Sequence, residues 1–140
     1  MPMTAAEIEA FIRAQFPQAE GFGTIEAIAD DALRMRLPFK DAYLRPGGTL
    51  SGPTLMMLAD TGAYYLLLAK LGPVALAVTT SLTIHFLRRP APVDAIANVR
   101  LLKLGKRIAV CDVLITVLGD PAPVAHATVS YALPPGTVVP

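Results

Sequence analysis

One carboxylate, Asp60, is the only charge between the two terminal residues of a long stretch. The stretch runs from Arg45 to Lys70 and reads RPGGTLSGPTLMMLADTGAYYLLLAK. A carboxylate among apolar residues is costly unless it is hydrogen-bonded, and buried acids also gather at reactive sites. Asp60 is therefore either a structural acceptor for a neighbouring segment or a reactive acid or base.

The same stretch begins with a loop that turns into a helix. Residues 45–53 are rich in glycine and proline, and Gly72 followed by proline predicts where the helix ends. Gly52 stands in the first turn, where an amide has no partner within the helix and the helix dipole favours negative charge. Pro53 lacks an amide, but its fixed φ suits that turn. The Gly52 amide is thus a ready donor to an oxygen that becomes negative.

Hydroxyl groups could assist this pair in binding or orienting a substrate. Tyr64 follows Asp60 by one helical turn on the same face, and Ser51 precedes the helix. On the strand expected next, Thr80 interrupts the apolar face and Thr79 faces the opposite way. A packed core tyrosine is the alternative for Tyr64, and helix capping is the alternative for Ser51. The candidates are Ser51, Thr61, Tyr64, Thr79 and Thr80.

Half of the chain's twelve Lys and Arg residues lie between positions 88 and 107, where Asp94 is the only acid. Guanidinium and ammonium groups at strand ends suit phosphate. A solvated strand edge that discourages aggregation is the alternative. The proposed phosphate-binding residues are Arg88, Arg89, Lys106 and Arg107.

The sequence lacks the residue patterns that a serine hydrolase or a metal site would need. A serine nucleophile at position 51 would need a histidine, and the only two, His85 and His126, fall in strand patterns. Cys111 lies in a strand-like apolar segment, which favours a packed thiol. These three residues lack the spacing of a metal site. We therefore expect no metal and no cofactor.

The elements that must position these residues follow from periodicity. Thr4 and Glu7 form a capping box ahead of an amphipathic helix that ends near Pro17. Residues 22–29 and 32–37 predict a hairpin. The helix after the glycine-rich loop has about 18 residues and is apolar nearly all round, which requires surrounding structure.

Four strands follow this helix, at 75–86, 94–104, 107–118 and 123–133. The order of helix, two strands, buried helix and four strands predicts an α+β fold, with an antiparallel sheet curled round one helix in a single domain of residues 1–140. Strand 107–118 is apolar on both faces, so we expect its outer side to meet another subunit.

The composition limits the kinds of partner that the chain is expected to bind. Charged residues make up 16% of the 140 residues and hydrophobic residues 54%, against about 25% charged in an average domain. This excess of apolar surface predicts a homo-oligomer. A net charge of +1 gives no field for nucleic acid or an anionic membrane. The longest apolar run, 54–69, is too short to span a membrane, the N-terminus lacks a signal-peptide pattern, and we expect a cytoplasmic protein.

The element order and the loop together resemble the hot-dog-fold acyl-CoA thioesterases of the PaaI-like and hydroxybenzoyl-CoA thioesterase group. That group's loop reads roughly N-P-x-G-x-x-H-G-G, followed seven residues later by Asp or Glu. RPGGTLSGP lies on this pattern and Asp60 falls at the acid. The resemblance continues through FLRRPAP and KLGKR and covers about residues 20–133. Arg45, Ser51 and Pro53 replace the usual Asn, His and second Gly.

The resemblance implies a hot-dog fold, with a six-stranded sheet round a central helix, and a dimer or dimer of dimers joined through the strand after that helix. It implies an acyl-CoA or aryl-CoA substrate, a carbonyl polarised by the Gly52 amide, and Asp60 as a general base or as a nucleophile that forms an anhydride. The two residues lie about 12 Å apart along a helix, so one carbonyl can touch both only if two protomers each supply one.

Two alternatives remain open from the sequence. Because the usual His and Asn are absent, the chain could be a non-catalytic acyl-CoA-binding or regulatory protein on the same fold. A hydratase on this fold would want a histidine near the central helix, and residues 45–70 contain none.

Overall fold

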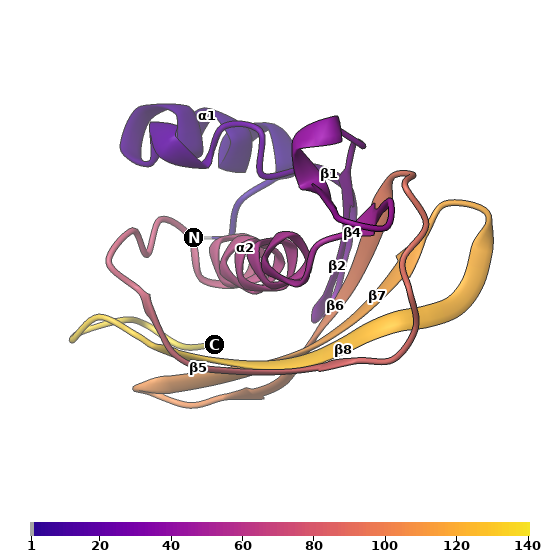
Figure 1. The fold of residues 1–140 in the computed structure, drawn as a ribbon. Coiled ribbons are helices and arrows are strands. Elements are labelled where there is room, and N and C mark those ends of the chain that lie inside the picture. The colour runs from indigo at the N-terminus through magenta and orange to yellow at the C-terminus, as the bar shows by residue number, and fades with distance from the viewer. Residues whose placement is uncertain (1) are drawn as a thin grey trace.

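The structure is a computed structural model that describes residues 2–140. Figure 1 shows its arrangement. The helices are α1 (Ala5–Gln15) and α2 (Gly52–Leu71), and short 3-10 turns occupy Pro17–Ala19 and Asp41–Tyr43. The strands are β1 (Thr24–Ala29), β2 (Ala32–Leu37), β3 (Leu44–Arg45), β4 (Thr49–Leu50), β5 (Val78–Phe86), β6 (Ala95–Leu104), β7 (Ile108–Val117) and β8 (Asp120–Ala132).

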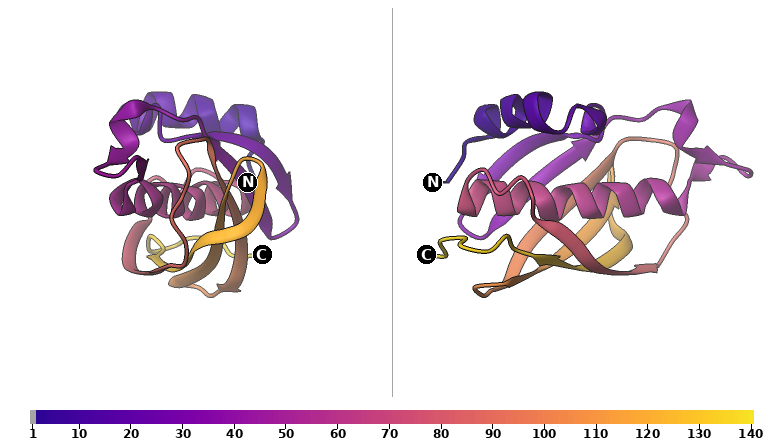
Figure 2. Two further views of the ribbon diagram at one scale, coloured as in Figure 1. Left: turned by 45° about the vertical axis from the view of Figure 1, so that its right-hand side comes forward. Right: turned by 90° about the vertical axis from the view of Figure 1, so that its left-hand side faces the viewer.

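Six strands form one antiparallel sheet in the order β1-β2-β6-β7-β8-β5. The sheet curves round α2, as Figures 1 and 2 show from three directions. β3 and β4 pair only with each other, as a small hairpin that projects beyond the N-terminal end of α2 (Figure 2, right). The predicted α+β architecture, with six strands round one long helix and a short N-terminal helix, is confirmed.

Helix α2 lies between the sheet and α1 (Figure 1). Ser51 caps its first turn, and the helix ends at Gly72, whose φ of 90° is costly for a residue with a side chain. Because other structure covers the helix on most sides, 14 of its 20 residues are buried. The uniformly apolar sequence is thereby explained.

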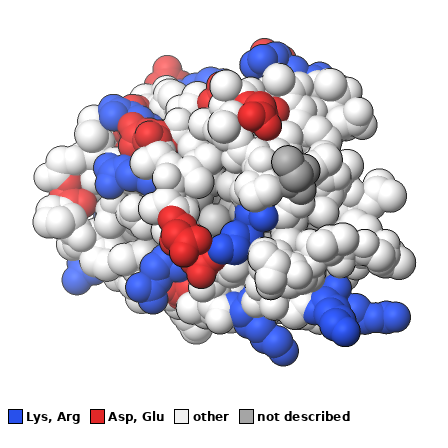
Figure 3. All heavy atoms as spheres, turned by 180° about the vertical axis from the view of Figure 1, so that it is seen from behind, with Lys and Arg blue, Asp and Glu red and all other residues white. Residues whose placement is uncertain are grey.

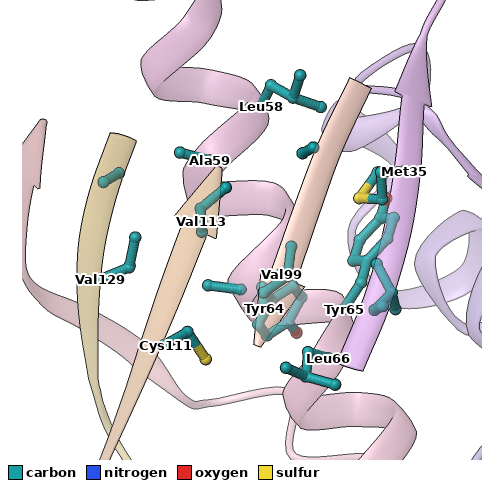
Figure 4. Packing of buried hydrophobic residues seen from close by; sticks show 14 of the residues in the cluster. Met35, Leu58, Ala59, Tyr64, Tyr65, Leu66, Val99, Cys111, Val113 and Val129 are labelled. Atoms are coloured by element: carbon teal, nitrogen blue, oxygen red, sulfur yellow. The ribbon is translucent and has the colours of Figure 1, made fainter. Parts of the chain in front are cut away.

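The core is the space between α2 and the inner face of the sheet. Figure 4 shows Leu58 and Ala59 of α2 among side chains from the central strands, including Val99, Val113 and Val129. All five are at most 1% exposed. Strand alternation accounts for this, since every second residue of these strands points toward α2.

Helix α1 begins as predicted, with the Thr4 hydroxyl accepting a hydrogen bond from the Glu7 amide at 3.2 Å. Ile8 and Ile12 are buried as its periodicity requires. Phe16 lies just past the last helical residue and is 39% exposed. Its ring borders the cavity described below.

The surface carries few charges. On the face shown in Figure 3, charged side chains are scattered between wide uncharged areas. No helix in the described residues 2–140 is long and apolar enough to cross a bilayer.

A close contact between α2 and β6 yields a test of this packing. A Cβ on Gly62 would lie 2.8 Å from Cγ2 of Val99. Gly62→Ala should therefore lower the free energy of unfolding by about 1–3 kcal/mol in urea titrations, although alanine favours helix by about 1 kcal/mol.

The matched control is the double variant Gly62→Ala with Val99→Ala. Its loss should be smaller than the sum of the two single losses, because the second change removes the methyl group that clashes. Additive losses would contradict the contact.

Candidate active site

Asp60 is held by two hydroxyl groups of the sheet. Its Oδ1 accepts hydrogen bonds from Thr79 Oγ1 at 2.6 Å and from the Tyr131 hydroxyl at 2.7 Å. The same tyrosine oxygen lies 3.1 Å from the backbone carbonyl oxygen of Asp60. Within residues 2–140, no donor bonds to Oδ2, and no buried side-chain oxygen is left without a partner, so Oδ2 is accessible.

A cavity of about 530 Å³ opens beside this carboxylate. It is bordered by the end of α1, the middle of α2, the segment before β5 and the last strand. Its lining residues are Gln15, Phe16, Phe22, Met57, Asp60, Thr61, Tyr64, Tyr65, Ala75, Ala77, Val78, Thr79 and Tyr131. One charged group thus faces a space with mainly apolar and aromatic walls.

The aromatic side chains of the wall contact one another. Phe16 meets the rings of Phe22 and Tyr64 edge-on, with centroids 6.4 Å apart in each pair. Tyr64 stacks on Tyr131 at 6.0 Å with 18° between the ring planes. Such contacts keep large side chains in place and shape the cavity.

Tyr64 is a wall residue whose hydroxyl is already satisfied. The hydroxyl donates to the carbonyl oxygen of Ala75 at 3.1 Å, and the residue is 8% exposed. Burial raises its pKa, so it stays neutral. Thr61, next to Asp60, also lines the cavity and is 9% exposed.

A β-bulge decides which threonine of β5 meets the carboxylate. Strict alternation predicts Thr80 on the apolar face and Thr79 on the opposite one. That assignment is wrong, because the register shifts between Thr79 and Ser81, and Thr79 points toward Asp60. Thr80 is exposed and donates to the carbonyl oxygen of Ser130 at 3.3 Å. An unpaired extra residue of this kind reverses side-chain direction without changing the composition of the strand.

Tyr131 contacts the candidate carboxylate and was not among the residues predicted from the sequence. It lies in β8 directly opposite Thr79 of β5 and is 4% exposed. The available signal was its position on the inner face of the last strand, between buried Val129 and Leu133. That signal could not separate it from a core tyrosine, because nothing in the sequence places β8 next to β5.

Gly52 and Ser51 lie at the N-terminal tip of α2, away from the cavity lining. Ser51 is the N-cap, since its Oγ accepts from the Thr54 amide at 3.3 Å. The Gly52 amide has no acceptor among the described residues. The Phe86 ring lies so close that a Cβ on Gly52 would be 3.2 Å from its Cζ. The tip therefore offers a free backbone donor at a position where the side chain of a larger residue would press on the Phe86 ring.

Within one chain, the four candidate phosphate-binding cations do not lie together. β5 and β7 both run antiparallel to β8, and Val78 and Ile108 pair with the same residue, Ala132. Arg88 and Arg89 follow the far end of β5, whereas Lys106 and Arg107 precede β7 beside the start of β5. All four are exposed, and Arg88 Nη1 donates to the Pro123 carbonyl oxygen at 2.7 Å.

The histidines and the cysteine lie outside the cavity lining. His126 Nε2 is hydrogen-bonded to Asp112 Oδ1, and His85 is the register partner of His126 on β5. Both histidines alternate with inward-facing residues, so they lie on the outer face of the sheet. Cys111 is buried in the core (Figure 4), and desolvation by burial raises its pKa to about 12.

The thioesterase superfamily model matches residues 47–124, which span the tip of α2, the carboxylate, three whole strands of the sheet and the start of β8. The chain belongs to the thioesterase superfamily. The predicted membership of the hot-dog thioesterases is thereby confirmed, and hydrolysis of thioesters is the activity of this family.

Solved structures agree. A protein of Silicibacter sp. whose name assigns it provisionally as a thioesterase is 43% identical, with a TM-score of 0.87, over 95% of this chain and 93% of that one. A mutant of phenylacetic acid degradation protein PaaI from Thermus thermophilus is 23% identical with a TM-score of 0.70, over 83% and 97%. Zebrafish thioesterase superfamily member 2 is 17% identical with a TM-score of 0.81, over 94% and 99%. The last two demonstrate the shared fold. No curated protein matches the sequence.

The buried thiol of this thioesterase generates a prediction on reactivity. Because the Cys111 pKa is raised from 9.0 to about 12, the folded protein should hold the thiol protonated far into the alkaline range. At about pH 8, Ellman's reagent should modify the folded protein ~100-fold more slowly than the protein unfolded in guanidinium chloride.

The pH dependence supplies the control. Between about pH 8 and pH 10 the unfolded thiol ionises and its reaction accelerates, while the folded thiol remains nearly unreactive. Rapid labelling of the folded protein would mean that Cys111 is accessible.

Proposed function

We propose that the protein hydrolyses an acyl-CoA or aryl-CoA thioester to the free acid and coenzyme A. The observation that carries the proposal is the state of the Asp60 carboxylate. Two hydroxyl donors hold Oδ1, and Oδ2 has no donor among the described residues beside a largely apolar cavity. A carboxylate oxygen without a protein donor beside a cavity is available to water or to a substrate.

Oδ2 has two ways to start the reaction. It can take a proton from a water molecule as that water attacks the carbonyl carbon; the C–S bond of the tetrahedral intermediate then breaks, and the leaving thiolate of coenzyme A takes the proton from Asp60. It can instead attack that carbon itself, forming an anhydride as the C–S bond breaks and the thiolate of coenzyme A leaves, after which water hydrolyses the anhydride. Both routes yield the carboxylic acid and the free thiol, and both need a donor for the carbonyl oxygen.

The Gly52 amide is that donor. It lies at the positive end of a 20-residue helix and has no acceptor within the described chain. Such an amide stabilises the oxygen as it becomes negative. Eight residues of helix, about 12 Å, separate it from Asp60, so both cannot serve one carbonyl within a single chain.

A second copy of the chain can associate through the edge strand β5. One side of β5 pairs with β8, and the other has no partner strand in the described chain. Large apolar side chains are exposed at both ends: Leu76 is 79% exposed, Val78 58%, Phe86 52% and Leu87 51%. A long edge strand flanked by apolar groups suits pairing with the same strand of a second protomer.

Antiparallel pairing of two β5 strands exchanges their ends. Thr79, which contacts Asp60, lies near the beginning of β5, and Phe86, which contacts Gly52, is its last residue. A two-fold axis through the strand pair brings the Gly52 end of one protomer toward the Asp60 end of the other, twice. Each dimer thereby has two equal reaction centres.

The same axis accounts for the divided cations. It moves Arg88 and Arg89 of one protomer toward Lys106 and Arg107 of the other, where together they can bind the phosphates of coenzyme A. The acyl or aryl group then occupies the aromatic cavity, whose size of about 530 Å³ is ordinary for a small-molecule site. The partly exposed apolar residues of β7, Ile108 and Leu114, suit association of two dimers.

Asp60→Asn tests the proposed activity. The amide keeps an acceptor for both hydroxyls but can neither accept a proton nor attack. On a panel of acetyl-CoA, hexanoyl-CoA and benzoyl-CoA, turnover of the preferred substrate should fall by ~10² or more, measured as release of free thiol.

Calorimetric titration should find that the Asp60→Asn variant still binds this substrate. If the wild type binds members of the panel and cleaves none, the chain is an acyl-CoA-binding protein and the proposed activity is wrong.

A complementation experiment tests the shared reaction centre. Gly52→Pro removes the amide, and the extended backbone of Ser51 tolerates a following proline. Asp60→Asn and Gly52→Pro should each be inactive alone, whereas their co-expressed heterodimer has one intact centre. Random pairing should restore about one quarter of wild-type activity.

Thermal melting of each variant supplies the folding control. If two folded, inactive variants remain inactive when co-expressed, Asp60 and Gly52 do not act across an interface between protomers.

A further inference from the structure

The hydroxyl of Tyr131 makes contacts with Asp60 that are not required for its ring to line the cavity. Other aromatic residues line the same space, and Tyr64 directs its hydroxyl to a backbone carbonyl oxygen. Tyr131 instead approaches two acceptor atoms of Asp60, the carboxylate Oδ1 at 2.7 Å and the carbonyl oxygen at 3.1 Å. Only Oδ1 gives a short, charge-assisted bond.

The tyrosine is itself immobilised by the sheet. It lies in β8 between β5 and β7, with register partners Thr79 and Ala109, and is 4% exposed. Its ring stacks on Tyr64. The position of its hydroxyl is therefore set by backbone pairing on both sides and by ring packing, more firmly than that of a surface residue.

The Tyr131 hydroxyl stays protonated, as a hydrogen-bond donor must. Burial, followed by the nearby Asp60 charge, raises the pKa of Tyr131, so the hydroxyl keeps its proton across the neutral and alkaline range. Thr79, the residue opposite it, donates to the same oxygen. Two donors on adjacent strands thus engage one carboxylate oxygen and leave the other facing the cavity.

We propose that Tyr131 is a positioning residue that fixes the rotation of the Asp60 carboxylate, so that Oδ2 rather than Oδ1 meets the substrate. This inference rests on the proposed thioester hydrolysis. Without the tyrosine, Thr79 alone holds Oδ1, and the carboxylate samples orientations in which its free oxygen turns away from the carbonyl carbon. Misorientation of a reacting group lowers the rate of the chemical step and leaves substrate binding intact.

Tyr131→Phe removes only the hydroxyl and keeps the ring that stacks on Tyr64. On whichever of acetyl-CoA, hexanoyl-CoA and benzoyl-CoA the wild type cleaves fastest, kcat should fall about 10- to 100-fold while KM changes less than about 2-fold. Tyr43→Phe is the matched control. Its hydroxyl donates to the Gly21 carbonyl oxygen at 3.2 Å outside the cavity lining, and wild-type kcat is expected.

A double-mutant cycle separates positioning from a merely structural role. In the Asp60→Asn background, adding Tyr131→Phe should change the residual rate by less than about 2-fold, because no reactive carboxylate remains to be oriented. Wild-type kcat in Tyr131→Phe, or an equal loss in both backgrounds, would overturn the positioning role while the loss in Asp60→Asn upholds the proposed function. If no member of the panel is cleaved, or Asp60→Asn stays fully active, the proposed function fails and this inference fails with it.

Discussion

The site depends on one hydrogen-bonded contact between a buried helix and the sheet wrapped round it. Helix α2 is covered on most sides, and an acid in its middle needs donors that α2 itself does not supply. Thr79 and Tyr131, side by side on β5 and β8, satisfy one of its oxygens. The helix and the curvature of the sheet are thus coupled to the orientation of a single carboxylate.

Much of the fold could be predicted because the relevant forces are local in sequence. The uniformly apolar run between glycine and proline breaks identifies α2, and alternation identifies the strands to within a few residues. Asp60 stands out because it is the only carboxylate in that run. Its partners could not be predicted equally well: Thr79 faces inward through a bulge, and Tyr131 reaches it through a strand order that alternation does not encode.

The low charge content and the exposed apolar residues at the ends of β5 both favour association with another chain. A chain with 54% hydrophobic residues exposes Leu76 and Phe86 on an unpaired edge, which favours association at that edge. The Phe86 ring also packs on Gly52, so the free amide at the helix tip adjoins the same strand. The proposed assembly and the proposed carbonyl-binding donor therefore depend on neighbouring atoms.

The far wall of the cavity belongs to a different part of the fold from the carboxylate. Gln15, Phe16 and Phe22 follow α1 or end it, and none of them lies in a strand of the sheet. Substitutions there can reshape the space without replacing either hydroxyl group that holds the acid. Descendants of one ancestral gene could in this way diversify their choice of acyl chain through a few changes near the N-terminus and inherit the reaction chemistry unaltered.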